Sequence, residues 1–580
     1  MDASDLTPVG KLQYKAIMEG EEVYKNLMEM SEDPMKYNEE LLLKLIEDNK
    51  DTEYGKKYDF ANIKSIEDYQ KKVPITTYDD YAEYIYRMTE KGEKNLISAY
   101  DITHYAKSSG TMGNPKRIPL STLSQKINND YAMAFRTAVI AKEFGIEWIN
   151  EIVLNLIEVS FTTLKCGATY GAVSGKMITN LSDMLHLFFT SPIEAFMPTL
   201  DTDSRYLHAR FALAYKDLSN AVCSFFNLFL DMLRYIQRDW ELLVKDIEKG
   251  TIDESIKMPD DVRKKLEANL KPMPERAAEL RDIFYKGFDE PMIPKIWPNL
   301  KVLTGIGTGG FANYYKKLKN DFADDSLNYY FVGLTASEGT FSVPFELNNP
   351  DAMLVPNSMF YEFLPLGSED FDDIVTIDGL EVGKRYEVIT TNLSGFYRYR
   401  MRDAIEVTGM KNNTPTIRFL YRIDQSISFA GESTSEEALR NAAYKTEDEC
   451  GFDLIDFSVY TESEDVPKCI YLMEIENIGD DFDKEKIRDK LAENVSEALT
   501  AGSEEFTRTS SKEASDYGHK LKSGILNNIE LKFLQPETYL LYRDLMISKG
   551  TSSAQLKPPR VIVNDIHKRF FLALLDDELN

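Results

Sequence analysis

The chain has 580 residues, of which 43% are hydrophobic and 28% charged, so it is too long for one hydrophobic core and is expected to form about two to four globular domains. Its 68 basic and 96 acidic residues give a formal net charge of −28, which argues against nucleic acid and against an anionic membrane surface as partners, since both bind basic faces. By itself, the acidity indicates only good solubility.

The four cysteines, at positions 166, 223, 450 and 469, have no Cys-x-x-Cys spacing, and the five histidines are equally scattered. The sequence therefore predicts neither a disulfide framework nor a zinc site. Its first residues lack the basic region and apolar run of a secretory signal. We expect a cytoplasmic protein, with a monomer as the default.

The first 95 or so residues have a charged, helical pattern, with leucines and an isoleucine on a helix at 39–48. The most apolar window, 221–230 (AVCSFFNLFL), is too short to cross a bilayer, and we interpret it as a buried helix. Two helices are expected between residues 203 and 249. Their apolar faces either belong to the core or wall a pocket for an apolar acid.

The densest polar cluster is the stretch 108–116 (SSGTMGNPK), which holds three hydroxyls, two glycines and a lysine. Glycines let a backbone approach an anion, hydroxyls donate hydrogen bonds and lysine adds charge, so the stretch favours a phosphate-binding loop. Strand-like residues flank it at 101–106 and 118–120, and Ser121 or Thr122 is expected to cap the helix that follows. A Walker loop would instead lead straight into a helix. A polar surface turn is the alternative.

A strand at 301–304, the glycines of GIGTGG at 305–310 and a helix at 311–319 have the outline of a dinucleotide-binding unit. The next strand, 328–332, ends without the acidic residue that such a unit needs, so we expect the glycines to approach another ligand. The segment LTASEG at 334–339, which contains Glu338, follows this strand directly. Glu338 is a candidate Mg²⁺ ligand, because ligands bind at the carboxyl ends of strands in open α/β sheets and Mg²⁺ prefers carboxylate and phosphate oxygens. A polar loop glutamate is the alternative.

Two strands joined by a turn are predicted at 387–391 and 395–403. Asp403, at the end of the second, can accept hydrogen bonds from a ribose; an exposed hairpin with charge pairs is the alternative. A strand at 419–424 closes the first part of the chain, and we place a domain boundary after residue 422. Strands at 454–460, 469–475 and 529–534, with a helix over 487–499, then predict a small α+β domain.

Four pieces of this sequence, in order, resemble motifs of the adenylate-forming enzyme superfamily. The stretch 109–116 (SGTMGNPK) resembles its phosphate loop, ASEG at 336–339 its adenine and magnesium motif, and YRMRD at 399–403 its ribose motif. The stretch GTSSAQLKPPR at 550–560 is similar to the C-terminal signature of one branch, the auxin-responsive (Gretchen Hagen) acyl acid amido synthetase family. The resemblance runs from about residue 40 to the end of the chain.

The resemblance implies an α/β fold with a large N-terminal adenylation domain, residues 1–422, whose mixed sheets are flanked by helices. It also implies a mobile α+β C-terminal lid domain, residues 423–580. Glu338 would bind Mg²⁺ and Lys557 would be the catalytic lysine that the lid brings to the site. The remaining ATP-binding residues implied by the family are Ser108, Ser109, Gly110, Thr111 and Lys116 at the phosphates, Thr335, Ala336 and Ser337 at the adenine, Asp403 at the ribose and Arg422 at the hinge between domains.

Three residues depart from the family pattern. Met112 replaces a Thr or Ser and removes one hydroxyl, and Leu334 stands where many members have an adenine-stacking Tyr. Arg402 replaces the usual Gly before Asp403 and would put a bulky charge beside the ribose site.

The predicted reaction activates a carboxylic acid with ATP as an acyl adenylate, which an amine, expected to be an amino acid, then attacks to give an amide and AMP. Mg²⁺ on Glu338 and the charge of Lys557 would offset the repulsion between the carboxylate and the phosphate. Two alternatives share the nucleotide residues: an acyl-adenylating thioester ligase that uses coenzyme A, and a catalytically silent nucleotide-binding relative.

Overall fold

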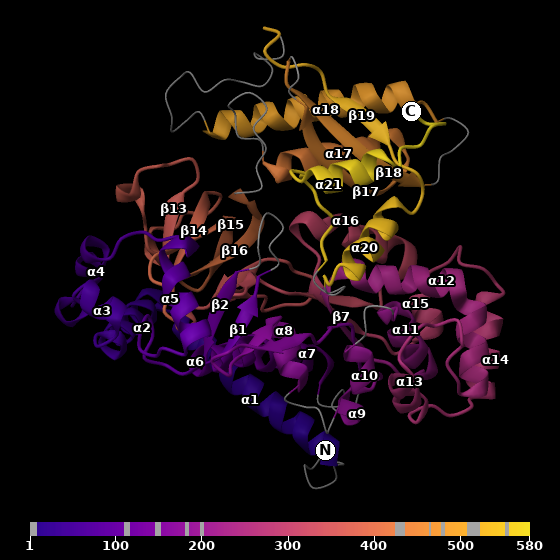
Figure 1. The fold of residues 1–580 in the computed structure, drawn as a ribbon, viewed down its shortest axis with the longest axis horizontal. Coiled ribbons are helices and arrows are strands. Elements are labelled where there is room, and N and C mark those ends of the chain that lie inside the picture. Colours follow the sequence, from indigo (N-terminus) through magenta and orange to yellow (C-terminus); the bar gives the residue numbers. More distant parts are fainter. Residues whose placement is uncertain are drawn as a thin grey trace.

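The computed structural model describes residues 8–108, 116–145, 152–179, 185–197, 202–423, 435–462, 466–476, 482–506, 523–551 and 556–580. Figure 1 shows a broad body that runs from α1 (Pro8–Met30) to β16 (Thr414–Arg422), with a smaller C-terminal part, orange to yellow, lying on top of it. The body combines several sheets with flanking helices, which confirms the predicted α/β fold.

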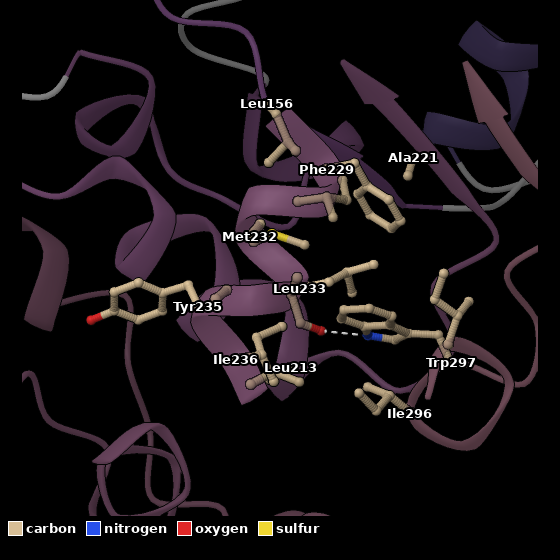
Figure 2. Packing of buried hydrophobic residues seen from close by; sticks show 14 of the residues in the cluster. Leu156, Leu213, Ala221, Phe229, Met232, Leu233, Tyr235, Ile236, Ile296 and Trp297 are labelled. Carbon is tan, nitrogen blue, oxygen red and sulfur yellow. Dashed lines mark hydrogen bonds between the residues drawn. The ribbon is translucent and has the colours of Figure 1, made fainter. Parts of the chain in front are cut away.

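A parallel sheet with the strand order β3-β6-β7-β8 lies inside the body. Its strands are β3 (Val153–Asn155), β6 (Asn220–Phe225), β7 (Val302–Ile306) and β8 (Asn328–Phe331), and the last two confirm the strands predicted around the glycine-rich segment. The largest hydrophobic core packs against this sheet. Figure 2 shows the buried Trp297 next to side chains of α12 (Phe226–Lys249). Its indole N–H donates to the carbonyl of Ala212 at 2.9 Å.

The apolar window 221–230 is not the single buried helix that we predicted. Its first half is strand β6, and helix α12 begins at Phe226. An inner strand of a parallel sheet is apolar without alternation, so periodicity does not separate it from a buried helix. Met232, Leu233 and Ile236 of α12 lie in the core, in line with the first of the two alternatives given for these helices.

The predicted phosphate loop joins two paired strands, as expected. Strand β1 (Ile102–Lys107) runs antiparallel to β2 (Arg117–Ser121) in a sheet with the order β2-β1-β5-β4, where β4 is Phe161–Thr163 and β5 is Thr169–Gly171. The Ser121 hydroxyl accepts the Ser124 amide at 3.0 Å and caps α6 (Thr122–Asn129), which confirms the predicted cap. The helix continues through a π-helical segment, 130–135, into α7 (Arg136–Phe144).

The predicted ribose motif, 399–403, belongs to a six-stranded antiparallel sheet with the order β11-β12-β16-β15-β14-β13. Strands β14 (Arg385–Asn392) and β15 (Tyr399–Lys411) are the predicted pair, but β14 is buried along almost its whole length, so the exposed hairpin is excluded. The other strands are β11 (Ser342–Val343), β12 (Ala352–Leu354) and β13 (Met359–Pro365). A two-stranded hairpin, β9 (Thr335–Ala336) and β10 (Gly339–Thr340), precedes them in the chain.

The C-terminal part has its own sheet, β17-β18-β19, and its own core. Its strands are β17 (Asp453–Glu462), β18 (Lys468–Glu476) and β19 (Glu530–Phe533), and its helices are α17 (Glu436–Cys450), α18 (Lys484–Phe506), α20 (Thr538–Ser548) and α21 (Asp565–Leu572). These elements confirm the predicted strands and the predicted helix.

Among the described helices, none combines the length and the apolar character needed to cross a bilayer. The remaining helices of the body are α2 (Pro34–Asn49), α3 (Glu53–Lys57), α4 (Ile66–Lys72), α5 (Ala82–Tyr86), α8 (Val173–Thr179), α9 (Leu185–Phe188), α10 (Ile193–Phe196), α11 (Ser204–Ala214), α13 (Asp260–Glu267), α14 (Pro274–Phe284), α15 (Ile293–Ile296) and α16 (Ala312–Lys317).

Candidate active site

The two ends of the predicted phosphate loop are held together. The Ser108 hydroxyl accepts the amide of Lys116 at 2.9 Å, and the Ser108 amide donates to the Lys116 carbonyl at 3.2 Å. The Lys116 ammonium donates to the Tyr399 hydroxyl at 3.3 Å and lies 5.3 Å from the centre of the Tyr78 ring. The loop therefore ends against strand β15. The other predicted loop residues, Ser109, Gly110 and Thr111, and the departure Met112, lie outside the described residues.

Glu338 stands at the tip of the β9–β10 hairpin. Ala336 pairs with Gly339, which leaves Ser337 and Glu338 as the turn. Asn128 on α6 holds strand β10 in place, because its side-chain oxygen accepts hydrogen bonds from both the amide and the hydroxyl of Thr340, each 3.1 Å long. Thr335 is exposed, whereas Ala336 and Ser337 are half-buried, so the segment predicted to face the adenine is open to a ligand.

The carboxylate of Glu338 is buried and has an unusual electrostatic environment. Burial raises its pKa, and the nearby Asp403 raises it further, whereas Arg422 and Lys116 act in the opposite direction. Among the described residues no cation lies within ion-pair distance of this carboxylate. A buried carboxylate without a direct partner favours binding of a cation, which suits the donor chemistry of a Mg²⁺ ligand. No group of three or more metal-ligating side chains occurs among the described residues, so phosphate oxygens and water would have to complete such a site.

Asp403 and Arg422 meet across the large sheet. They are directly opposite each other in the β15–β16 register, and Arg422 Nε donates to Asp403 Oδ1 at 2.9 Å. Asp403 is only 2% exposed, whereas the Arg422 side chain is 41% exposed. The pair therefore leaves acceptor capacity on Asp403. The Arg422 charge is also close enough to lower the pKa values of Glu338 and Lys557.

Two departures from the family pattern are explained by the structure. Arg402 has a φ of +60°, a left-handed conformation that glycine adopts freely. Its guanidinium lies 3.6 Å from Glu387, whereas the next residue, Asp403, pairs with Arg422. The Arg402 charge thus lies beside Glu387, whereas Asp403, the predicted ribose residue, is paired with Arg422. Leu334 packs against the core that includes the large sheet and supplies no aromatic surface.

Lys557 lies at the junction of the two parts of the chain. Its ammonium is 4.8 Å from the centre of the Phe225 ring and 5.7 Å from that of Phe311, and these two rings stack at 4.4 Å. Part of the side chain is exposed, but the ammonium is surrounded by protein. Burial, with help from Arg422, lowers the pKa of Lys557 to about 8, while Asp403 and Glu436 oppose this shift.

The glycine-rich segment after β7 has two separate tasks. Gly305 and Gly307 lie under the ring of Phe226, where an added Cβ would stand 2.8 Å and 2.3 Å from ring atoms, so they serve packing. Gly309 and Gly310 form the turn before Phe311, one of the two rings beneath Lys557. That these glycines approach another ligand stays a prediction, and only the second pair lies next to the surroundings of Lys557.

The structure brings Lys116, Glu338, Asp403, Arg422 and Lys557 into one electrostatically connected group, although they are spread over more than 400 residues of sequence. Sequence reasoning missed the side chains that hold this group in place. Asn128 and Tyr78 carry no motif, and Phe225 belonged to the window that we interpreted as a helix.

Three consecutive family models match the chain: the GH3 family N-terminal domain over residues 23–327, the GH3 family central domain over 352–422 and the GH3 family C-terminal domain over 436–566. The chain belongs to the GH3 family. This confirms the resemblance drawn from the motifs. The central-domain match ends at Arg422, and β15 and β16, which carry Asp403 and Arg422, fall within it.

Curated relatives of this GH3 protein match it almost from end to end. The putative indole-3-acetic acid-amido synthetase GH3.9 of Arabidopsis thaliana is 26% identical over 94% of this chain and 94% of its own length. The 4-substituted benzoates-glutamate ligase GH3.12 of the same plant is also 26% identical, over 93% and 94%. Among solved structures, the AtGH3.15 acyl acid amido synthetase in complex with 2,4-DB superposes with a TM-score of 0.83 at 21% identity, covering 96% of each chain, which shows a shared fold.

Proposed function

We propose that this GH3 protein is an ATP-dependent acyl acid amido synthetase, which converts a carboxylic acid to an acyl adenylate and then joins the acyl group to an amine, releasing AMP. The observation that carries the proposal is the convergence of Lys116, Glu338, Asp403 and Arg422 with Lys557, in a chain of this family. Its curated relatives include amido synthetases and an acid–glutamate ligase, which supports an amino acid as the amine.

Different residues would contribute to the first step, formation of the acyl adenylate, in different ways. Attack of a carboxylate on the α-phosphate of ATP brings two anions together, so positive charge near the reacting atoms lowers the barrier. Lys557 supplies such a charge from the C-terminal side and Lys116 from the base of the phosphate loop. Ser109, Gly110 and Thr111 stay predictions for the same loop. Asp403, which Arg422 holds through a hydrogen bond, would accept the ribose hydroxyls. The accessible surface of Thr335, Ala336 and Ser337 would lie against the adenine.

Glu338 would hold Mg²⁺, which when bound neutralises charge on the phosphate oxygens. The carboxylate is suited to this, since it is buried with no cation of the described chain at ion-pair distance. Residues 423–580 would form a mobile lid on the body, residues 1–422. Closure of such a lid excludes water, which would otherwise hydrolyse the adenylate before the amine arrives. A cytoplasmic, monomeric state remains a prediction from the sequence.

The test measures pyrophosphate release with ATP and Mg²⁺ across a panel of carboxylic acids, with and without each amino acid. We expect release that depends on one class of acid, followed by amide and AMP formation when the correct amino acid is present. A requirement for coenzyme A, with a thioester as product, would contradict the amido synthetase assignment. ATP binding without turnover of any acid would favour the silent relative.

A further inference from the structure

The segment that carries Lys557 is attached to the C-terminal sheet by its backbone. The Val459 amide of β17 donates to the Arg560 carbonyl at 2.8 Å, and the Ile562 amide donates back to the Val459 carbonyl at the same distance. Residues around 560–562 therefore run along β17 like a short additional strand. Three residues before Arg560, the Lys557 side chain reaches the Phe225 ring of the body.

The side chain of Arg560 connects this strand to the body. It forms a close ion pair with Asp456 of β17, donates to the Phe457 carbonyl at 2.8 Å and lies 4.7 Å from the centre of the Phe457 ring. Its other terminal nitrogen donates to the carbonyl of Gly310, in the body, at 3.2 Å. Arg560 and Asp456 are 9% and 5% exposed, so this charge pair is almost sealed from water.

A tyrosine of the body completes the cluster. Tyr314 on α16 donates its hydroxyl to the second oxygen of Asp456 at 2.5 Å. Burial and the nearby Asp456 raise the pKa of Tyr314, so the hydroxyl keeps its proton and stays a donor. The neighbouring Asn313 donates to the Leu454 carbonyl of β17 at 3.1 Å. One carboxylate is thus shared by a cation from the C-terminal part and a hydroxyl from the body.

The same turn of the body serves both the cluster and the lysine. Gly310 accepts from Arg560, and the next residue, Phe311, is one of the two rings beneath the Lys557 ammonium. A buried charge pair is costly unless all of its hydrogen bonds are made. Two hydrogen bonds of this pair, Tyr314 to Asp456 and Arg560 to Gly310, join the C-terminal part to the body, so they exist only when the two parts are docked in this way.

We infer that Arg560 and Tyr314, joined through Asp456, are positioning residues that hold Lys557 at the adenylation site in this docked arrangement. The inference rests on the proposed function, because it assigns the lysine to the adenylation step. We assign Arg560 and Tyr314 an indirect role: they would act on the reaction through the placement of Lys557.

The experiment compares Tyr314→Phe with a matched control, Tyr471→Phe. Tyr471 is also a buried tyrosine, and its hydroxyl donates to the Leu439 carbonyl, a hydrogen bond that lies within the C-terminal part. Two half-reactions are measured separately: pyrophosphate release from ATP and the acid, and amide formation from chemically prepared acyl adenylate and the amine.

We expect Tyr314→Phe to lower kcat for pyrophosphate release about tenfold, with KM for ATP changed less than threefold, because a single buried hydrogen bond to a charged group is lost. Arg560→Lys should lower kcat for pyrophosphate release about a hundredfold. A lysine ammonium cannot donate to Asp456, Phe457 and Gly310 at once, as the planar guanidinium of Arg560 does. Amide formation from supplied adenylate should change less than threefold in both, because it requires no attack on the phosphate. Tyr471→Phe should match the wild type in both half-reactions.

Amide hydrogen exchange of the peptides covering α16 and residues 556–562 gives a readout that needs no turnover. It should be faster in Tyr314→Phe than in the wild type and in Tyr471→Phe. Wild-type adenylation or exchange rates in Tyr314→Phe, or an equal loss in both half-reactions, would overturn the inference. If the wild-type protein makes no adenylate, the proposed function fails, while the exchange comparison still decides whether the Asp456 cluster docks the two parts.

Discussion

The carboxylate side and the lysine side of the site are built in different ways. Asp403 and Arg422 face each other in one antiparallel sheet, and Glu338 sits on a hairpin that Asn128 fastens to a neighbouring helix, so all three are placed within the body. Lys557 instead depends on contacts between two cores, through Phe225 and Phe311 on one side and Arg560 on the other.

This difference predicts how each side responds to change. Sheet register is set by many backbone hydrogen bonds, so a substitution on the carboxylate side should alter the local chemistry and leave the geometry intact. The lysine side is held by a few side chains at a junction, where the loss of one contact shifts the balance between docked and undocked states.

The largest effect is expected from Lys557→Ala. Removal of the charge should lower the rate of adenylate formation by about 10²- to 10³-fold, the usual cost of one donor that stabilises developing charge. Single-turnover pyrophosphate release measures it. Lys549→Ala, which removes an exposed lysine of the same part of the chain, is the control and should match the wild type. A Lys557→Ala rate within threefold of the wild type would refute the catalytic assignment.

Asp403→Ala tests the carboxylate side. It removes the proposed ribose acceptor and leaves Arg422 without its partner, so kcat/KM for ATP should fall about a hundredfold while the melting temperature changes little. The control is Asp351→Ala, which breaks a surface pair with Arg418 on the same sheet, 2.6 Å long, and should cost almost nothing. Equal kinetics for the two variants would mean that Asp403 does not contact ATP.

The pH dependence of adenylation sharpens the comparison further. Because the pKa of Lys557 is lowered to about 8, its ammonium loses the proton as the pH rises through that value. We expect kcat/KM for adenylation to fall about tenfold per pH unit above 8 if only the charged lysine is active. Lys557→Arg, whose side chain stays charged, should lose this alkaline limb. If kcat/KM of Lys557→Arg fell in the same way above pH 8, the alkaline decline would belong to another titrating group.

The smallest effect is expected at Arg402. Arg402→Gly relieves a left-handed backbone and gives up a half-exposed contact with Glu387, so the free energy of unfolding should change by no more than about 1 kcal/mol and activity by less than twofold. Arg398→Gly is the matched comparison, because Arg398 also has a positive φ but is buried and forms two hydrogen bonds of 2.9 Å with Glu362.

Urea unfolding of both arginine variants measures the difference. Arg398→Gly should destabilise the fold by about 3 kcal/mol or more, since it leaves a buried carboxylate unpaired. A large loss of activity in Arg402→Gly would show that this arginine contributes to the ribose site after all.

The strands that carry the motifs could be predicted because each is short, apolar and bounded by turn residues. This holds for 101–106, for 301–304 and for the three strands of the C-terminal part. The window 221–230 could not, because the inner strand of a parallel sheet and the first turns of a buried helix are both continuously apolar. The error had a consequence: it hid Phe225, the residue at the end of β6 on which the Lys557 ammonium rests.

The motifs in the sequence were enough to identify the family and the residue types of the site, since glycines, hydroxyls, carboxylates and lysines in this order are recognisable without any structure. What each residue faces was decided by the tertiary structure alone. The pairing of Asp403 with Arg422, the direction of Arg402 toward Glu387 and the lowered pKa of Lys557 all arise from neighbours that are distant in sequence. Hydrogen bonds and desolvation act over a few ångströms of space, and one chain gives no measure of that distance until it has folded.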